Sequence, residues 1–399
     1  MTYKNIIINL LFGATFFNHL HLLSFIPQHN KPLLLLLFPI FLLYIFRYKS
    51  PFSYSLILWI IGFFFIVFGA IIWNLFLGDF QYYYPEIIKR MISYLVLFYF
   101  FYVGIIFWQD RDCISNKFYP FFIIIGLIQV YSFFDLPFSN IFNNIFNKYL
   151  ISSFGTVGSM ILFFEAEPSY VAYLIIFLMV FYEKKNTFIW IAFSIMTISV
   201  RTTMISFLYY IKKRPLRYGF IIITALSIVM SITQVNYSVF SRLKAIATFQ
   251  TLDPSTYIRF VNNSIGLQII NDYPIFGVGP GQYSTYYSGK YLLKYDTREI
   301  HELQSGLDKK TKTADPYSFF LGIISELGIF SLLWILISFI FLFYKSHRKY
   351  LIAILFLILM WGYPFGKPYI WIILGYIYGE IKFNNYNNNK RDQLIPVNK

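Results

Sequence analysis

Residues 57–76 have the sequence ILWIIGFFFIVFGAIIWNLF, twenty residues without a charged side chain. About 20 apolar residues are enough for a helix to cross the hydrocarbon core of a bilayer. This stretch therefore predicts a transmembrane helix. Comparable apolar runs, which predict an all-α polytopic membrane protein, occupy residues 33–46, 91–108, 118–134, 174–182 and 220–232.

The composition of the whole chain indicates the same class. Of the 399 residues, 58% are hydrophobic, 23% are aromatic and 13% are charged, and the mean hydropathy is +0.59. A soluble domain of this length could not bury so many apolar side chains, because its surface needs a polar shell. The composition therefore excludes a water-soluble globular protein.

The hydropathy pattern predicts about twelve transmembrane helices in a single membrane domain that covers residues 1–399. The first span lacks a strongly basic start and a small-residue cleavage site, so we expect it to be retained rather than removed as a signal peptide. The predicted helices lie near residues 5–26, 33–46, 55–77, 88–108, 118–135, 167–183, 187–200, 202–212, 217–235, 317–344, 350–364 and 367–382.

Basic residues are concentrated in alternate turns, which predicts the orientation. With both termini in the cytoplasm, the one long polar segment, residues 236–316, is a loop facing the periplasm or the extracellular space. The net charge of +15 then reflects topology and gives no reason to expect a nucleic-acid partner. The predicted cytoplasmic turns contain Arg47, Lys49, Arg111, Lys117, Lys184, Lys185, Lys212, Arg214, Arg217, Lys345, Arg348 and Lys349, and the short outer turns contain Lys31, Lys89, Arg90, Lys148, Arg201 and Lys367.

The sequence EAEPSY at residues 165–170 precedes a predicted span. Pro168 suits the first turn of a helix, and Glu167 before it would interact favourably with the helix dipole. The cluster can therefore simply begin a helix. Alternatively, Glu167 is a carboxylate at the boundary of water and lipid that acts as a general base or accepts a sugar hydroxyl.

A second outward cluster, SVRTT at residues 199–203, lies between two short apolar helices. Arg201 at its centre could extend to lipid phosphates at the membrane surface. It could also form a bidentate pair with a specific phosphate, for which the planar guanidinium is well suited. We favour the specific phosphate, because the neighbouring hydroxyl groups add hydrogen-bond donors.

The outer loop contains PIFGVGPGQY at residues 274–283, after a predicted helix over residues 258–270. Gly277, Gly279 and Gly281 permit positive φ and close backbone approach, which can turn successive N–H groups toward an anion. On the glycines alone, a plain turn is the favoured interpretation. The segment is not a dinucleotide-binding fingerprint, because no βαβ unit surrounds it.

The span after the loop opens with DPYS at residues 315–318 and places Glu326 about three turns inside the membrane. A carboxylate within a span indicates a functional or a structural hydrogen bond. The single Cys113 and the five histidines form no cluster with metal-ligand spacing, so we expect no metal site. A metal site at His19 and His21 in the first span is the alternative to packed or hydrogen-bonded histidines, which we favour. The Asn-rich sequence FNNYNNNKRDQ at residues 383–393 is expected to be disordered.

The order of these motifs resembles one family. Arg259 precedes P-x-FGVGxGxY by about 15 residues, and a span with L-x-x-x-x-E-L-G-I follows after a variable loop. With SVRTT and EPSYVA, this order is similar to that of the O-antigen polymerase and O-antigen ligase superfamily (Wzy and WaaL). The resemblance covers roughly residues 165–330 in short motifs, whereas the first 160 residues match in topology alone.

The resemblance implies a GT-C-like membrane glycosyltransferase that acts at the outer face of a bacterial cytoplasmic membrane. Its donor and acceptor would be undecaprenyl-diphosphate-linked glycans, it would need neither a metal nor another cofactor, and a chain-length regulator is a further partner that the resemblance suggests. Arg201 and Arg259 would bind the diphosphate, together with Arg90 on a predicted outer turn. The glycines at 277, 279 and 281 would border the sugar site with Tyr283 and Tyr317.

The general base stays open between Glu167, His301 and Asp315. Ligases of this superfamily carry a His-Asn pair where this chain has Tyr317 and Ser318. This departure favours a polymerase of repeat units over a ligase that transfers the glycan to lipid A core. A transporter of lipid-linked oligosaccharide is the third alternative, but the sequence shows neither an inverted repeat nor interrupted helices.

Overall fold

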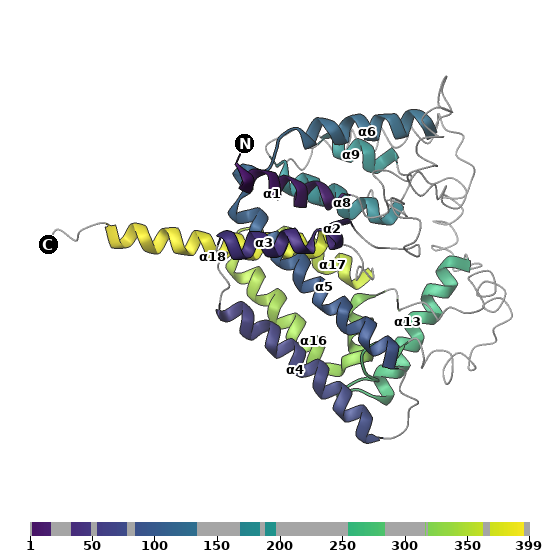
Figure 1. Ribbon diagram of the computed structural model, residues 1–399. Coiled ribbons are helices and arrows are strands. Elements are labelled where there is room, and N and C mark those ends of the chain that lie inside the picture. Colours follow the sequence, from purple (N-terminus) through teal and green to yellow (C-terminus); the bar gives the residue numbers. More distant parts are fainter. Residues whose placement is uncertain are drawn as a thin grey trace.

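The computed structural model describes residues 2–16, 33–48, 54–77, 84–133, 168–183, 188–196, 254–283, 316, 318–361 and 368–394 (Figure 1). Within these ranges the regular elements are all helices and no β-strand occurs, so the predicted all-α class is confirmed for them. The helices are α1 (Tyr3–Ala14), α2 (Leu33–Leu36), α3 (Phe38–Tyr48), α4 (Tyr54–Leu77), α5 (Tyr84–Gln109), η1 (Arg111–Cys113), α6 (Phe118–Phe133), α8 (Pro168–Phe181), α9 (Phe188–Met196), α13 (Pro254–Asp272), α16 (Phe319–Lys345), α17 (Lys349–Trp361) and α18 (Pro368–Leu394).

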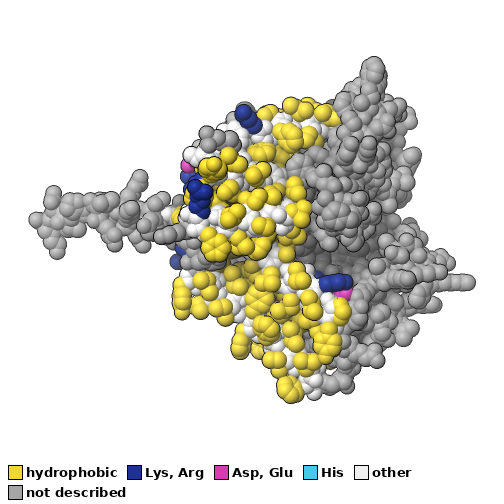
Figure 2. Space-filling view, viewed as in Figure 1, with side chains coloured by type: hydrophobic (Ala, Val, Ile, Leu, Met, Phe, Trp, Pro, Cys, Tyr) yellow, Lys and Arg dark blue, Asp and Glu magenta, His cyan; other side chains and the backbone are white. Residues whose placement is uncertain are grey.

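Three of the described helices are long and apolar enough to cross a membrane: α4 over Tyr54–Phe76, α5 over Tyr84–Gln109, and α16 over Phe319–Lys345. In the view of Figure 2, hydrophobic side chains cover most of the described surface, and charged side chains lie at its edges. Both observations are compatible with a helical membrane protein. The total of twelve crossings stays a prediction, and the spans predicted at residues 202–212 and 217–235 lie outside the described residues.

Helices α5 and α18 pack with their backbones in direct contact. A Cβ atom added at Gly104 would lie 2.0 Å from the carbonyl oxygen of Ile372, and one added at Gly375 would lie 1.8 Å from that of Phe101. No side chain fits at either position. Gly375 and Gly379 have the small-xxx-small spacing that lets membrane helices approach closely, so these glycines hold α18 against α5.

Aromatic rings fill the space between α1, α5, α6 and α8. The ring centroid of Phe12 lies 5.4 Å from that of Phe107, 5.3 Å from Phe118 and 5.6 Å from Phe177. Such pairs contribute about 0.5–1.5 kcal/mol each beyond the area that they bury. Because lipid is as apolar as these side chains, close packing of this kind has to hold the helices together.

Residues from different predicted cytoplasmic turns meet at one end of the bundle. Arg348 pairs with Glu380 (Nε–Oε2 2.8 Å) and with Glu183 (Nη1–Oε2 3.1 Å). Lys4 pairs with Asp110 at 2.5 Å. In Figure 1 the start of α1 and the C-terminal half of α18 also lie on this side. The contacts therefore agree with the predicted alternation of turns.

The C-terminal segment differs from the prediction. Helix α18 continues to Leu394, so the backbone of residues 383–393 is helical and the expectation of disorder is wrong for it. Extending an existing helix avoids the cost of nucleating a new one, which is why polar residues can continue it. Figure 1 shows this half of α18 projecting away from the other helices.

The orientation can be measured with single cysteines in a Cys113→Ala background. We expect Ser288→Cys to react with an impermeant maleimide in intact cells and Asn388→Cys to react only after permeabilisation, because basic turns stay in the cytoplasm. Burial raises the pKa of the Cys113 thiol and Asp110 raises it further, which keeps the thiol protonated at neutral pH, and Cys113→Ala removes its remaining reactivity. Labelling of Asn388→Cys alone in intact cells would reverse the orientation.

Candidate functional site

A glycine segment, defined here as residues 273–283, follows α13 directly. Helix α13 covers the helix predicted at residues 258–270, and it ends just before Tyr273 and Pro274. Gly277, Gly279 and Gly281 have φ values of 64°, 93° and 73°. Glycine adopts such angles without a steric penalty. The predicted positive-φ conformation is therefore confirmed at all three glycines.

The glycine segment packs against a break in α16. Gly328 has φ 72° and ψ −169°, a conformation almost restricted to glycine, and it interrupts the helix. The expectation of uninterrupted helices is therefore wrong for the span predicted at residues 317–344. In a regular helix the N–H of Ile329 would donate to the carbonyl of Ser325. Here the Ile329 N–H donates to the carbonyl of Pro274, and the N–H of Val278 donates to that of Ser325, both at 2.9 Å. The segment thus completes the hydrogen bonding that the break interrupts.

Further backbone contacts bring the segment even closer to α16. The N–H of Gly279 donates to the carbonyl of Glu326 in α16 at 2.8 Å, whereas that of Gly277 donates within the segment, to the carbonyl of Tyr273 at 3.1 Å. A Cβ atom at Gly277 would lie 2.5 Å from the carbonyl carbon of Glu326. Close backbone approach is confirmed. The interpretation as an anion nest is wrong for these N–H groups and for that of Val278, because they bind protein carbonyls.

A buried ion pair lies beside this contact. The carboxylate of Glu326 is 1% exposed, and its Oε1 lies 2.8 Å from Nη2 of Arg90 in α5, whose side chain is 12% exposed. The other carboxylate oxygen accepts a hydrogen bond of 3.0 Å from the hydroxyl of Tyr94. A buried charge is tolerated when it is paired in this way. The buried hydrogen bond predicted for Glu326 is therefore present, and its partners come from α5.

The C-terminal end of α4 and the N-terminal end of α5 enclose the other side of the glycine segment. The side-chain amide of Asn74 donates to the carbonyl of Gly277 at 3.1 Å. A Cβ atom at Gly281 would lie 2.4 Å from the carbonyl oxygen of Glu86. Glu86 also pairs with Lys89 at 2.9 Å. The segment is thus fixed between α4, α5 and α16.

Two buried asparagines next to the segment were not identified from the sequence. Tyr283 is fully buried, and its hydroxyl donates to the carbonyl of Asn262 at 2.6 Å, so Tyr283 has a packing role here. Within the described part of the chain, no hydrogen bond reaches the side-chain oxygen of Asn262 or that of Asn74. Buried amides of this kind normally bind water or a ligand group. Their position beside the glycine segment is what makes Asn74 and Asn262 candidate site residues.

Of the remaining predicted site residues, Arg259 lies within a described helix. It belongs to α13, and its side chain is outside the described part of the structure. Ser318, which stands where ligases carry part of the His-Asn pair, accepts a hydrogen bond of 3.4 Å from the N–H of Leu321 and caps α16. The predicted site residues that lie outside the described ranges are Glu167, Arg201, His301, Asp315 and Tyr317.

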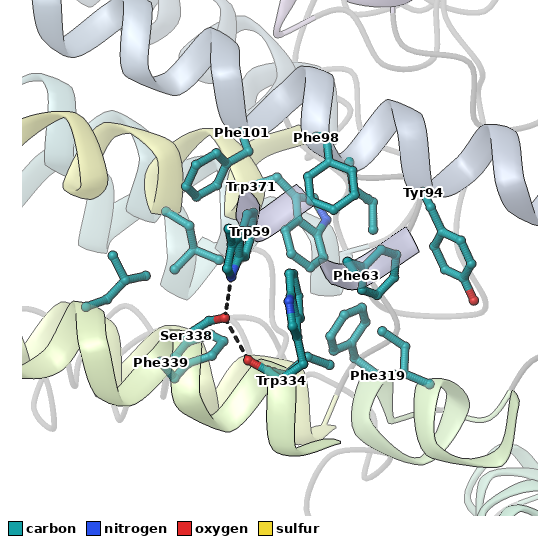
Figure 3. A pocket seen from close by; sticks show the side chains of 15 residues that line it. Trp59, Phe63, Tyr94, Phe98, Phe101, Phe319, Trp334, Ser338, Phe339 and Trp371 are labelled. Carbon is teal, nitrogen blue, oxygen red and sulfur yellow. Dashed lines mark hydrogen bonds between the residues drawn. The ribbon is translucent and has the colours of Figure 1, made fainter. Parts of the chain in front are cut away.

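An apolar pocket with a cavity volume of about 60 Å³ lies between α4, α5, α16 and α18 (Figure 3). Two of its polar wall groups bond within the wall: Trp59 Nε1 donates to the hydroxyl of Ser338, which donates to the carbonyl of Trp334, both at 2.7 Å. Figure 3 shows Tyr94 at one end of the pocket. Since the Tyr94 hydroxyl bonds Glu326, the pocket adjoins the buried ion pair.

Comparison with protein-family models, with curated proteins and with solved structures found no match. The resemblance in motif order therefore depends on the chain's own residues. Two of its motifs, the glycine segment and the E-L-G sequence of α16, are joined by backbone hydrogen bonds.

Proposed function

We propose that the protein is a membrane glycosyltransferase that polymerises undecaprenyl-diphosphate-linked oligosaccharide repeat units into O-antigen or a related surface polysaccharide. It would act in a bacterial cytoplasmic membrane, with its active site facing the periplasm. The observation that carries the proposal is the contact between the glycine segment and the E-L-G break of α16. Motifs about 50 residues apart in the sequence form one unit, as expected if their order in the chain reflects a common site.

The proposed reaction needs two kinds of group. An acceptor hydroxyl oxygen attacks the anomeric carbon, the bond from that carbon to the diphosphate breaks, and the diphosphate leaves with the electron pair. Arginines stabilise the leaving charge, as Arg201 and Arg259 would do here with help from Arg90. A base takes the hydroxyl proton, which typically contributes about 10²–10⁴-fold to the rate.

Glu167 is our first candidate for that base, with His301 and Asp315 as alternatives. Glu167 directly precedes α8, at the predicted boundary where an acceptor hydroxyl would be presented. We expect Glu167→Gln to abolish chain growth if Glu167 is the base. Retained long chains in Glu167→Gln would remove it from this role and leave the proposed function in place.

The apolar pocket supports a lipid-linked substrate. Three of the helices that form it, α4, α5 and α16, are the described helices long enough to cross a membrane. Its walls are hydrophobic and aromatic, which suits a segment of a hydrocarbon chain. We assign it to part of the polyprenyl chain, so that the diphosphate would lie toward Tyr94 and Arg90.

A ligase and a transporter are the two alternatives to a polymerase. A ligase would transfer the finished glycan to lipid A core, and Tyr317 with Ser318 in place of His-Asn argues against it. A transporter would carry the lipid-linked oligosaccharide without joining units.

Purified protein with a single synthetic lipid-linked repeat unit tests the proposal directly. We expect mass spectrometry to find products that grow by whole repeat units, because the same lipid-linked unit serves as donor and acceptor. A deletion strain should display one repeat unit on its surface lipid, since ligation continues without polymerisation. Long chains that accumulate on undecaprenyl diphosphate in the deletion strain, with none on the surface, would instead identify a ligase.

A further inference from the structure

Glu326 makes side-chain and backbone contacts to different parts of the site. Its carboxylate binds Arg90 Nη2 at 2.8 Å and the Tyr94 hydroxyl at 3.0 Å. Its backbone carbonyl accepts the N–H of Gly279 at 2.8 Å. One residue of α16 therefore connects α5 to the glycine segment.

The geometry of the carboxylate fixes the direction of the guanidinium. Arg90 and Tyr94 are four residues apart in α5 and so lie on the same face of that helix. They engage the two different oxygens of Glu326, which prevents the carboxylate from rotating. The guanidinium is a rigid plane with five N–H donors, so anchoring Nη2 orients the whole group.

Helix packing alone does not require this ion pair. Replacement of a buried pair by apolar side chains of similar size is often neutral or stabilising, whereas removal of one partner is costly. A pair with the same N–O distance, Arg348–Glu380 at 2.8 Å, lies at the other end of the bundle. The two pairs can therefore be compared within one protein.

We propose that Glu326 is a positioning residue that holds Arg90 beside the glycine segment in the orientation that binds the diphosphate of a lipid-linked substrate. The inference rests on the proposed function for the identity of that substrate. The ring of Tyr94 borders the apolar pocket, so a lipid chain in the pocket would bring its diphosphate to the turn of α5 that carries Arg90.

The first test measures binding of undecaprenyl diphosphate to purified protein in nanodiscs, with turnover of the lipid-linked repeat in parallel. Glu326→Gln keeps the shape of the side chain and removes its charge. We expect its affinity for the diphosphate to fall about 10–100-fold, the range of one hydrogen bond to a charged group. Affinity and turnover equal to those of the unmodified protein would overturn the proposal.

Paired substitutions separate positioning from folding. Arg90→Met with Glu326→Met removes both charges and should keep the thermal unfolding midpoint while losing diphosphate binding. Arg348→Met with Glu380→Met is the control at the other end of the bundle. It should keep both, because Glu183, which also pairs with Arg348, is 42% exposed and stays hydrated. Three results would each overturn the proposal. The two double variants could lose binding equally, or the Arg90→Met, Glu326→Met variant could retain binding or fail to fold.

The assay also distinguishes the inference from the function on which it rests. If the unmodified protein binds the diphosphate but joins no repeat units, the proposed polymerase function fails and the positioning role is still tested by binding. If the unmodified protein does not bind the diphosphate, the positioning role itself is overturned.

Discussion

Arg201→Lys and Arg259→Lys are each expected to reduce the formation of long glycan chains by about 100-fold or more. Both arginines lie in predicted outward-facing segments on either side of residue 236, where the large loop begins. A diphosphate leaving group gains charge as its bond to the anomeric carbon breaks. A planar guanidinium can hold two phosphate oxygens at once, and a lysine ammonium cannot reproduce that bidentate geometry.

The measurement is the chain-length distribution of surface polysaccharide in a deletion strain that expresses each variant at a matched level. Arg47→Lys is a suitable control, because Arg47 lies at the predicted cytoplasmic end, 5.5 Å from the ring of Tyr3. It should leave chain lengths unchanged. Normal chain lengths in both Arg201→Lys and Arg259→Lys would rule out the proposed diphosphate clamp.

Hydropathy predicted the positions of the helices well because the signal is local. Residues 57–76 lie within α4, and residues 88–108 lie within α5. Each such helix satisfies its own backbone hydrogen bonds, so its apolar length is enough to predict it. The same reasoning failed for residues 383–393, where polar composition suggested disorder but the backbone continues α18.

The partners of the site residues could not be predicted, because they depend on which helices are neighbours. The sequence indicated that Glu326 needed a buried partner, yet Arg90 lies 236 residues away in the chain. It also indicated close backbone approach at Gly277 and Gly279 without identifying α16 as the surface that they approach. The sequence therefore predicted an anion site at N–H groups that, in the structure, donate to the carbonyls of Ser325 and Glu326.

One packing signal was available in the sequence. Residues 375–379 read GYIYG, a small-xxx-small spacing within a predicted span. The structure shows that these glycines meet Phe101 and Trp108 of α5. The spacing predicts a close helix contact, but it cannot say which helix is the partner.

Gly328→Ala is expected to have the largest effect on folding, a loss of about 2–6 kcal/mol. Its φ of 72° strains any residue with a Cβ atom. That atom would also lie 1.9 Å from the carbonyl oxygen of Ile275, which is backbone and cannot rotate away. The glycine segment would have to move, and its hydrogen bonds to Ser325 and Glu326 would break.

Thermal unfolding in detergent and limited proteolysis at the glycine segment measure this effect, and Gly62→Ala in α4 is the matched control. The Cβ atom at Gly62 would meet only Trp334 Nε1, at 3.9 Å, so this variant should be unchanged or slightly more stable. A Gly328→Ala protein with the midpoint and proteolysis of the unmodified protein would show that the break in α16 does not hold the segment. If Gly328→Ala still folds, we expect it to lose diphosphate binding and to be cleaved faster at residues 273–283. Both effects are expected because Glu326 connects the glycine segment to Arg90.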